Sequence, residues 1–440
     1  MAVLPDQRLG PLLAWGGGAL VPLVLWALGG GWAAPPGRGA GGPAVRIVAQ
    51  GAGLVGMALL SVSFVLSTRL RRVEAYFGGL DGMYREHHRL GVAAVGLLTL
   101  HALAIAARFV PHDLGRAVGM LLPVHARWAV DLGVLAFWGL LLLVAVTFTA
   151  GVPYDTWKLT HKGLGLVLLG GVAHTLLLES TPGQRVAVAE QSALRLYMGV
   201  LMALGLAGAV YTIVVRPLRP GVRYTVSAVH RLNEDVMEVE LSPRDAPLTA
   251  EPGQFVFVTF RDDPLSRESH PYTLCGPADD PALRISVKAL GDYTNRLYDC
   301  LEAGVEARLD GPYGRFDYRV GGDRQVWIAG GVGIAPFLGW ARNLDGDGPR
   351  TVALYYCVHD RTDAVYRREF EALARRHSNV TVALVCSVEE GHLRAEDVGP
   401  VEDTDIFMCG PQRLTRDLRR QFRRRGVPDR RIHFEDFEFR

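Results

Sequence analysis

Cysteine is scarce in this chain, and so is excess charge of either sign. Five cysteines occur among 440 residues, all lie beyond residue 270, and no two stand in a CxxC pair. This pattern argues against a disulfide framework, a zinc site or an iron–sulfur cluster, and it fits a reducing cytosol. The formal net charge is only +2 and no basic run is present, which argues against a nucleic-acid partner.

Regulatory and targeting signals are also missing. The sequence has no EF-hand loop and no SH3-like or proline-rich segment, so no regulatory subunit is evident. The first apolar stretch has no clear small-residue cleavage site, and we expect a retained helix there instead of a signal peptide. Two or three domains are expected from a chain of 440 residues.

Long apolar runs fill the first half, from residue 9 to about residue 215, whereas the second half reads as an ordinary soluble protein. A hydrocarbon core about 30 Å thick needs about 20 apolar residues per helix. Six such stretches predict six membrane spans, near 9–30, 45–67, 87–109, 128–150, 161–179 and 192–215.

Basic residues predict the orientation of these spans, because short cytoplasmic loops are enriched in Lys and Arg. Most of the basic residues near the spans follow an even-numbered span: Arg69, Arg71, Arg72, Arg85, Arg89, Lys158, Lys162, Arg216, Arg219 and Arg223. We therefore expect both termini and the soluble half on the cytoplasmic side of a multi-pass protein.

Four histidines in the apolar half form matched pairs. His88 and His101 are 13 residues apart, as are His161 and His174. Thirteen residues span about 20 Å of helix, so two such helices side by side would present imidazoles at two levels. Polar residues within a membrane are costly and tend to be functional. The pattern favours two stacked b-type hemes, each with two axial histidines.

The spacing leaves alternatives open. Thirteen residues separate two side chains by about 140° around an ideal helix, so one helix needs a local bulge or one heme a different approach. His87 lies 14 residues before His101, only about 40° from the same face, and is an alternative ligand to His88. The histidines could instead be hydrogen-bonded core residues or line a proton path.

The soluble half divides into two patterns. Short alternating strands broken by Pro and Gly, such as 254–260 and 283–289, predict a small antiparallel barrel. From residue 325, apolar strands at 326–329, 352–356, 381–385 and 405–408 alternate with helices, as in a parallel α/β sheet.

Three motifs in this half point to cofactors. His270-Pro271-Tyr272-Thr273 suits the edge of a planar ring, although it is also a plain strand entry. The turn from Ala329 to Phe337 contains Gly330, Gly331, Gly333 and Pro336 between a strand and a helix, where a pyrophosphate or only a tight turn is accommodated. Cys409-Gly410-Pro411 ends the last apolar strand, where Cys409 either contacts a nicotinamide or is simply buried.

Taken in order, these motifs resemble the flavocytochrome b superfamily of transmembrane NADPH oxidases and ferric reductases, over nearly the whole chain and in a short prokaryotic form. The resemblance implies that two segments besides His270–Thr273 hold FAD. They are Gly291-Asp292-Tyr293-Thr294 and Gly311-Pro312-Tyr313-Gly314. It also implies nicotinamide-nucleotide binding by residues 329–337 and 409–411, and an aromatic near the C-terminus over the flavin, Phe437 or alternatively Phe439. The family often has an Arg near His359 that holds a 2′-phosphate. Arg361 is the implied contact here, and the alternative is loose discrimination between NADPH and NADH.

Together these patterns predict three domains: a six-span di-heme bundle over 1–216, a flavin-binding β-barrel over 217–320, and an α/β nucleotide domain over 321–440. We expect electrons to pass from cytoplasmic NAD(P)H through FAD and two hemes to an acceptor outside a prokaryotic inner membrane. Oxygen, giving superoxide, is the favoured acceptor. Ferric iron and a periplasmic partner protein are the alternatives, and a transport or anchoring unit fused to a reductase is the non-enzymatic one.

Overall fold

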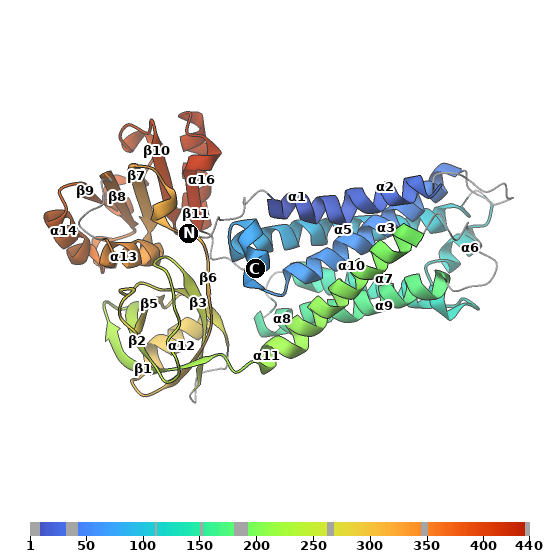
Figure 1. Ribbon diagram of the computed structural model, residues 1–440, viewed down its shortest axis with the longest axis horizontal. Helices are drawn as coiled ribbons and strands as arrows, with labels where there is room; N and C mark the ends of the chain where they lie inside the picture. The colour runs from blue at the N-terminus through green and yellow to red at the C-terminus, as the bar shows by residue number, and fades with distance from the viewer. Residues whose placement is uncertain are drawn as a thin grey trace. The chain divides into compact units, whose positions relative to one another are not determined.

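The computed structural model describes residues 9–31, 43–110, 112–149, 152, 154–179, 192–261, 268–344 and 351–435. The chain forms two compact units that divide between Arg219 and Pro220. The first unit is helical and the second contains two β-sheets (Figure 1). The C-terminal positions Phe437 and Phe439 lie outside the described residues.

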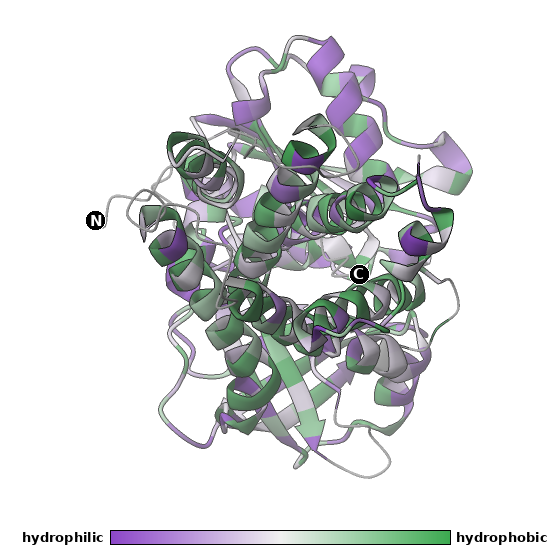
Figure 2. Cartoon of the chain, turned by 90° about the vertical axis from the view of Figure 1, so that its right-hand side faces the viewer, coloured by the Kyte–Doolittle hydropathy of each residue, from purple (hydrophilic) through white to green (hydrophobic). Residues whose placement is uncertain are grey.

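Long apolar helices build the first unit, because only hydrogen-bonded helices or closed barrels satisfy the backbone in lipid. The described residues contain six helical segments long and apolar enough to cross a membrane: 9–28, 44–66, 80–107, 128–148, 156–178 and 192–218. Their elements are α1 (Leu9–Trp15), η1 (Gly16–Leu20), α2 (Val21–Leu28), α3 (Pro43–Leu66), α5 (Leu80–Ala107), α7 (Trp128–Phe148), α8 (Tyr154–Lys162), α9 (Leu164–Glu179), α10 (Ser192–Val210), η3 (Tyr211–Val215) and α11 (Arg216–Leu218). Short helices α4 (Arg71–Glu74), η2 (Ala75–Phe77) and α6 (Leu114–Gly119) lie between them. Apolar residues predominate along these helices in Figure 2.

Small residues set the packing of the bundle. Helix α3 runs along both α5 and α10, and α7 runs along α9. At Gly205 of α10, an added Cβ would lie 2.8 Å from the Cα of Ser61, and at Gly208 it would lie 2.7 Å from the carbonyl oxygen of Phe64. Helices in membranes approach closely where such residues meet, so α10 is seated directly on α3.

The second unit begins with a six-stranded antiparallel sheet in the order β4-β3-β6-β1-β2-β5. A bridge between Leu274, just after β4, and Ile285 of β5 joins the two edges, so the sheet closes into a barrel. Helix α12 (Asp292–Cys300) follows β5. The strands are β1 (Val222–Arg231), β2 (Val236–Pro243), β3 (Phe255–Arg261), β4 (His270–Thr273), β5 (Leu283–Lys288) and β6 (Glu306–Tyr313).

The chain then forms a five-stranded parallel sheet in the order β11-β10-β7-β8-β9. Its strands are β7 (Arg324–Gly330), β8 (Thr351–Val358), β9 (Val380–Cys386), β10 (Thr404–Cys409) and β11 (Ile432–Glu435). Its principal helices are α13 (Ala335–Arg342), α14 (Arg367–Arg376) and α16 (Gln412–Arg424). The predicted fold class, a helical membrane bundle followed by an antiparallel and a parallel sheet, is confirmed.

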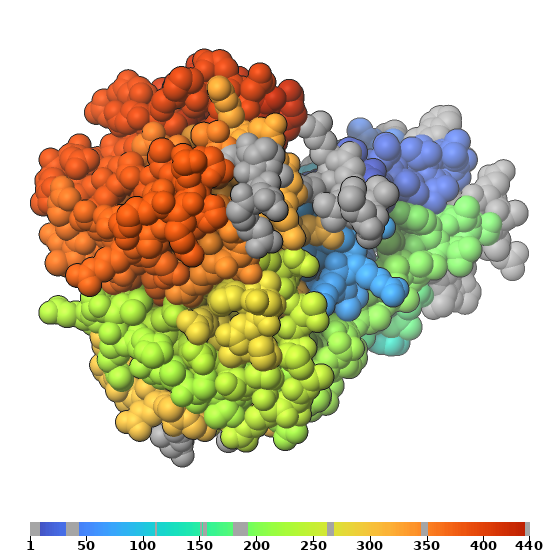
Figure 3. Space-filling view, turned by 60° about the vertical axis from the view of Figure 1, so that its left-hand side comes forward, coloured from blue at the N-terminus to red at the C-terminus, as the bar shows by residue number. Residues whose placement is uncertain are grey.

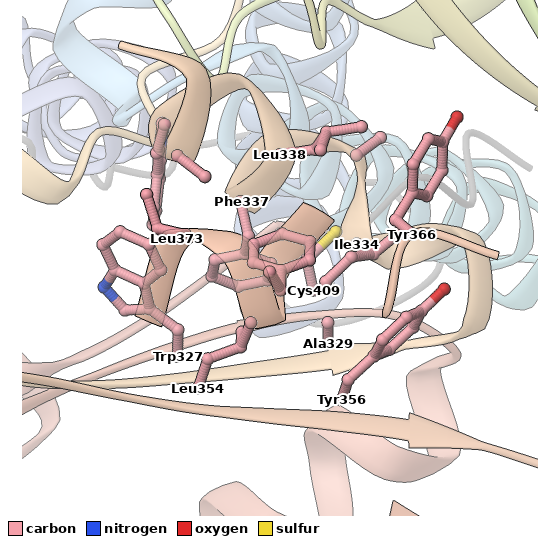
Figure 4. Close-up of a cluster of buried hydrophobic side chains, with 14 of the residues drawn as sticks. Trp327, Ala329, Ile334, Phe337, Leu338, Leu354, Tyr356, Tyr366, Leu373 and Cys409 are labelled. Carbon is pink, nitrogen blue, oxygen red and sulfur yellow. The ribbon is translucent and has the colours of Figure 1, made fainter. Parts of the chain in front are cut away.

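Buried aromatic and aliphatic side chains hold the second unit together. Trp327 and Phe337 stack with ring centroids 5.8 Å apart between the parallel sheet and α13 (Figure 4). A separate apolar cluster fills the barrel, with Tyr224, Phe260 and Ile285 fully buried. The barrel residues and those of the parallel sheet form a continuous surface in Figure 3. Both halves therefore have their own cores within one compact unit.

Candidate functional site

Two levels of histidine lie in the helical unit, and we call His87 with His161 the first histidine level. Their ring centroids are 6.1 Å apart in an edge-to-face arrangement. His88, which the equal 13-residue spacing favoured, is instead exposed and has its ring 6.2 Å from that of Phe148. Because α5 is continuous, 14 residues place His87 within about 40° of the face that carries His101. The structure therefore points His87, the alternative, toward His161.

His101 on α5 and His174 on α9 form the second histidine level. They lie 14 and 13 residues after His87 and His161, respectively, along the same helical spans. The Nδ1 atom of His101 is 2.7 Å from the carbonyl oxygen of Ala49 on α3. The Nδ1 atom of His174 is likewise 2.7 Å from the carbonyl oxygen of Ala129 on α7. Each ring is thus tied to the backbone of the helix that packs beside its own.

A helix interruption accounts for the 13-residue spacing between His161 and His174. Helix α8 ends at Lys162 and α9 begins at Leu164. Around Gly163, the amide of Gly163 donates to the carbonyl of Thr160 and the amide of Leu166 donates to the carbonyl of Gly163, each three residues back. A three-residue turn rotates the chain more per residue than an α-helix does. Part of the expected 140° offset is thereby removed.

The hydrogen bonds fix the tautomer of all four rings. A carbonyl oxygen only accepts, so His101 and His174 must carry their proton on Nδ1. His87 does the same, with Nδ1 2.9 Å from the carbonyl oxygen of Ser63. The hydroxyl of Thr147 donates to the carbonyl of Leu143 at 2.8 Å and accepts from Nδ1 of His161 at 3.5 Å. Each Nε2 atom therefore keeps its lone pair, the form in which imidazole binds a metal.

The donor set fits a heme iron better than a bare metal ion. Among the described residues, no three or more His, Cys, Asp or Glu side chains gather into a metal-ion site. Each histidine level offers two imidazoles, and a porphyrin supplies the remaining four iron ligands, so two protein ligands per level are sufficient.

In the barrel, the first two flavin motifs meet. The ring of His270 on β4 stacks on that of Tyr293 on α12, with centroids 4.2 Å apart and planes 19° apart. His270 also pairs with Glu268 at 2.9 Å. The hydroxyls of Tyr272 and Tyr293 are buried, and neither has a hydrogen-bond partner among the described residues. Burial raises the pKa of both phenols, so both stay protonated and can donate.

An unpaired buried hydroxyl is costly, and such groups in native proteins usually have a partner. Two of them on adjacent motifs fit a polar ligand edge, as FAD would present. The second motif also opens a helix: Thr294 Oγ1 accepts the amides of Leu290 and Gly291 at 2.9 and 3.0 Å and so shapes the turn at the start of α12. Helix N-termini favour anions such as a pyrophosphate.

The third flavin motif ends β6. Gly311, Pro312 and Tyr313 are its last residues, and the Tyr313 hydroxyl donates to Asp310 at 2.8 Å. The Tyr313 ring packs on the rings of Phe255 and Phe257 of β3, with centroids 6.0 and 5.8 Å away. Gly314 has a φ of +94°, which favours glycine, and the chain turns there toward the parallel sheet.

The two nucleotide motifs come together at one edge of the parallel sheet. Strands β7 and β10 are neighbours, with Ala329 in register with Cys409, so the glycine turn and Gly410 follow adjacent carboxyl ends. The strand order reverses at β7, because β8 and β9 lie on one side and β10 on the other. Ligands of open α/β sheets bind in the crevice at such a switch point.

Glycines let the two turns approach each other closely. A Cβ at Gly333 would lie 2.5 Å from the carbonyl oxygen of Cys409, and one at Gly410 would lie 2.9 Å from the backbone of Gly330. These two glycines are therefore needed for packing between the two turns. Gly331 differs: its φ is +55° and a Cβ there would meet nothing within 4 Å among the described residues. Gly331 is thus the glycine with open space beside it.

Two predicted nucleotide residues belong to the core. Cys409 is fully buried beside Ala329, Ile334 and Phe337, and Phe337 is itself fully buried (Figure 4). Pro336 occupies the first turn of α13, where a missing amide hydrogen costs nothing. A contact between Cys409 and a nicotinamide stays a prediction, as does the stacking of Phe437.

Arg361, the implied contact for a 2′-phosphate, is already engaged. Its guanidinium binds Glu389 through bonds of 2.6 and 2.8 Å, and Glu390 lies 3.8 Å away. Hydrogen bonds between the two raise the pKa of Arg361 and lower the pKa of Glu389, so both are charged at neutral pH. A phosphate approaching Arg361 would meet two carboxylates.

Several contact residues escaped the sequence reasoning. Ser63 and Thr147 hold the first histidine level, and Ala49 and Ala129 hold the second. One signal was present: Ala49 and Ala129 are each followed four residues later by a glycine, on the helices next to the histidine helices.

Comparisons with known proteins agree with this arrangement. A "ferric reductase like transmembrane component" matches residues 52–172, an "FAD-binding domain" matches 222–317, and an "oxidoreductase NAD-binding domain" matches 327–420. In this order, the three matches make up the domain architecture of NADPH oxidases and ferric reductases. The chain is a multi-pass membrane oxidoreductase with FAD-binding and NAD-binding domains.

Similar proteins cover mainly its soluble half. A flavohemoprotein of Pseudomonas putida is 30% identical over 204 residues, which are 43% of this chain and 52% of that protein. The reductase subunit of an aromatic O-demethylase from Amycolatopsis is 32% identical over 243 residues, 51% of this chain and 71% of the subunit. The chain spans 52% and 60% of the two flavohemoproteins that it matches. The flavohemoglobin structure from Malassezia yamatoensis, with a TM-score of 0.51 and 18% identity over 91% of this chain and 100% of that one, shares the fold.

Proposed function

We propose that this oxidoreductase moves electrons from cytoplasmic NAD(P)H through FAD and two b-type hemes to an acceptor outside the membrane, with oxygen as the favoured acceptor. The observation that carries the proposal is the two histidine levels. Four imidazoles in an apolar bundle are all held with Nδ1 as donor and Nε2 available. Such costly polar groups inside a membrane need a function, and bis-histidine heme ligation uses every one of them.

The ligand pairs follow from the geometry. His87 and His161 would hold the inner heme, and His101 and His174 the outer heme. His87 replaces His88 in this assignment because the His88 ring is exposed beside Phe148. When bound, FAD takes a hydride from the nicotinamide and the hemes carry its electrons singly across the membrane.

The chain's own residues bind and orient in the soluble unit. The buried hydroxyls of Tyr272 and Tyr293 would donate to the flavin edge. The start of α12 and the turn at Gly331 would accept the two pyrophosphates. Cys409 lies beneath the nucleotide crevice, and Phe437 would stack on the flavin as the family resemblance implies. The barrel would thereby hold the flavin ring, and the parallel sheet would present the nicotinamide ring.

The orientation follows from the basic loops. Arg71 and Arg72 lie between the second and third spans and Arg85 lies near the start of the third, at the end of the bundle to which the sixth span also leads. Basic loops of this kind remain in the cytoplasm. We therefore place the protein in the inner membrane of a prokaryote, with the second histidine level toward the outside.

Ferric-chelate reduction is the second candidate, because the transmembrane segment matches a ferric-reductase-like component over residues 52–172. Electron supply to a periplasmic partner protein would use the same outward path. These functions share every internal residue and differ only in what meets the outer face.

One experiment tests the core of the proposal and then the acceptor. The purified full-length protein should show a low-spin b-type spectrum with two hemes per chain. His87→Ala and His161→Ala should each remove one heme, His101→Ala and His174→Ala the other, and His88→Ala should be the matched control that retains both. Loss of heme in His88→Ala but not in His87→Ala would overturn the ligand assignment, and a heme-free wild type would overturn the function.

The electron acceptor is then identified with the same purified protein. Superoxide formation with NAD(P)H, sensitive to superoxide dismutase, is expected to exceed anaerobic reduction of a ferric chelate. A faster ferric-chelate rate without superoxide would assign the protein as a ferric reductase instead. Heme reduction without turnover on either acceptor would point to a protein partner.

A further inference from the structure

Three of the four rings reach a main-chain carbonyl, and His161 does not. At the second level, each Nδ1 lies 2.7 Å from a main-chain carbonyl, that of Ala49 for His101 and that of Ala129 for His174. At the first level, Nδ1 of His87 lies 2.9 Å from both the carbonyl oxygen and the hydroxyl of Ser63. The Nδ1 atom of His161 has the hydroxyl of Thr147 at 3.5 Å instead.

A glycine stands at the same position beside both second-level rings. In an α-helix, the carbonyl of one residue points at the amide four residues later. For Ala49 and Ala129 that residue is Gly53 and Gly133. A side chain there would stand between the carbonyl and any ring approaching from the neighbouring helix.

The distances show how little room there is. A Cβ added at Gly53 would lie 2.5 Å from Nδ1 and 2.9 Å from Cε1 of His101. A Cβ added at Gly133 would lie 2.5 Å from Nδ1 and 2.6 Å from Cε1 of His174. Real Cβ atoms essentially never approach other atoms this closely, and the close neighbour is a ring held by a hydrogen bond, not the free end of a flexible chain.

We propose that Gly53 and Gly133 are positioning residues that seat the two outer ligands: each makes a helix groove in which an imidazole reaches a backbone carbonyl. The proposal rests on the proposed function. Donation from Nδ1–H to a carbonyl makes the imidazole a more basic ligand and fixes its ring orientation. The outer heme is therefore set by backbone that a side-chain substitution does not remove. At the inner heme, His87 also reaches a main-chain carbonyl, that of Ser63, whereas His161 depends on the hydroxyl of Thr147 and is open to adjustment through it.

The glycine test uses the full-length protein. Gly53→Ala and Gly133→Ala should each lower the content of the outer heme, or shift its ferric low-spin EPR signal, and should leave the inner heme and the FAD unchanged. Gly96→Ala is the matched control, because Gly96 lies on α5 between His87 and His101 and a Cβ there meets nothing within 4 Å among the described residues. Unchanged EPR signals and potentials in both variants of a protein that carries two hemes would overturn the inference without touching the proposed function.

A second measurement guards against a variant that merely folds badly. Gly53→Ala should lower the melting temperature of the protein in detergent, but not when His101→Ala has already removed the ring. The same loss in both backgrounds would mean that Gly53 matters for helix packing alone, and the inference would fall.

A third measurement tests the role of the Thr147 hydroxyl at the first histidine level. Thr147→Val should raise the reduction potential of the inner heme only, because it withdraws the acceptor from Nδ1 of His161, whereas Thr147→Ser should restore it. The expected change is up to tenfold in the ratio of reduced to oxidised heme, which is about 59 mV for one electron. A shift of the outer heme, or none in either, would contradict the assignment.

Discussion

Arg342 joins the two halves of the soluble unit, and its removal gives the sharpest stability prediction. It extends from α13 and binds Glu369 of α14 at 2.8 and 3.0 Å, Glu238 of β2 at 3.0 Å and the carbonyl of Cys275 at 2.9 Å. Burial by itself would lower the pKa of Arg342, but the hydrogen bonds to Glu369 and the charge of Glu238 raise it. One guanidinium thus ties the parallel sheet to the barrel.

The magnitude follows from burial. The side chains of Arg342 and Glu238 are 13% and 9% exposed, so Arg342→Met leaves the Glu238 carboxylate almost without solvent and with Arg284 at 3.7 Å as its remaining cation. Breaking a buried pair by removing one partner costs about 3–5 kcal/mol. Glu369 is 39% exposed and is rehydrated when released, so we expect the lower end, about 3 kcal/mol.

The assay is urea unfolding of a soluble fragment of residues 220–440. Both of its tryptophans, Trp327 and Trp340, are buried and report the core of the parallel sheet. Arg367→Met is the control, since the Arg367–Glu371 pair is exposed on α14 and should matter little. Adding Glu238→Gln to Arg342→Met should recover at least about 1 kcal/mol, the range expected for directly paired residues. A loss below about 1 kcal/mol, or strict additivity, would refute the reasoning.

Three further predictions concern the cofactors. We expect the wild-type preference for NADPH over NADH, measured as a ratio of kcat/KM values, to lie within about tenfold of unity. Glu389→Gln should release Arg361 and raise this ratio by about tenfold. No change would exclude Arg361 from phosphate binding. Gly331→Val should raise KM for NAD(P)H several-fold while FAD and heme stay intact, because its side chain would project into open space, and parallel loss of FAD would indicate misfolding instead. Tyr293→Phe should weaken FAD binding, seen by fluorescence titration, since a flavin contact would lose the Tyr293 hydroxyl; unchanged affinity would show that this hydroxyl has no flavin partner.

Hydropathy and strand periodicity predicted most of the architecture. Apolar runs predicted the six spans, and strands such as 352–356 and 405–408 lie within β8 and β10. The third span shows the limit, because α5 begins at Leu80, not near residue 87. Residues 81–88 are largely polar, so hydropathy ends the span there, although nothing in them breaks a helix.

Which histidine of α5 faces His161 could not be read from spacing alone. Equal 13-residue intervals favoured His88, but an uninterrupted α5 puts the 14-residue partner His87 on the face of His101. The interruption at Gly163 is local and leaves no mark on the hydrophobic pattern. Long-range contacts such as those of Arg342 and Arg361 are equally hidden, because they join residues 27 to 104 positions apart in the sequence.

The two helix pairs that hold the histidines are similar but not identical, and the difference bears on function. On α3 and α5, the holding residues Ala49 and Ser63 are 14 residues apart, as are His101 and His87, so two straight antiparallel helices match at both levels. On the other side, the Thr147 hydroxyl lies at the carbonyl of Leu143, which is also 14 residues from Ala129, whereas the two histidines are 13 residues apart.

This difference of one residue coincides with the break at Gly163, two residues after His161. The longest of the four Nδ1 contacts, 3.5 Å between His161 and Thr147, belongs to the histidine next to this break. Of the four rings, His161 has the longest Nδ1 contact, although the ring of Trp157 stacks on it with centroids 5.2 Å apart. We therefore expect the heme proposed at the first histidine level to be lost first on mild denaturation, whereas both rings of the second level are bound to backbone carbonyls.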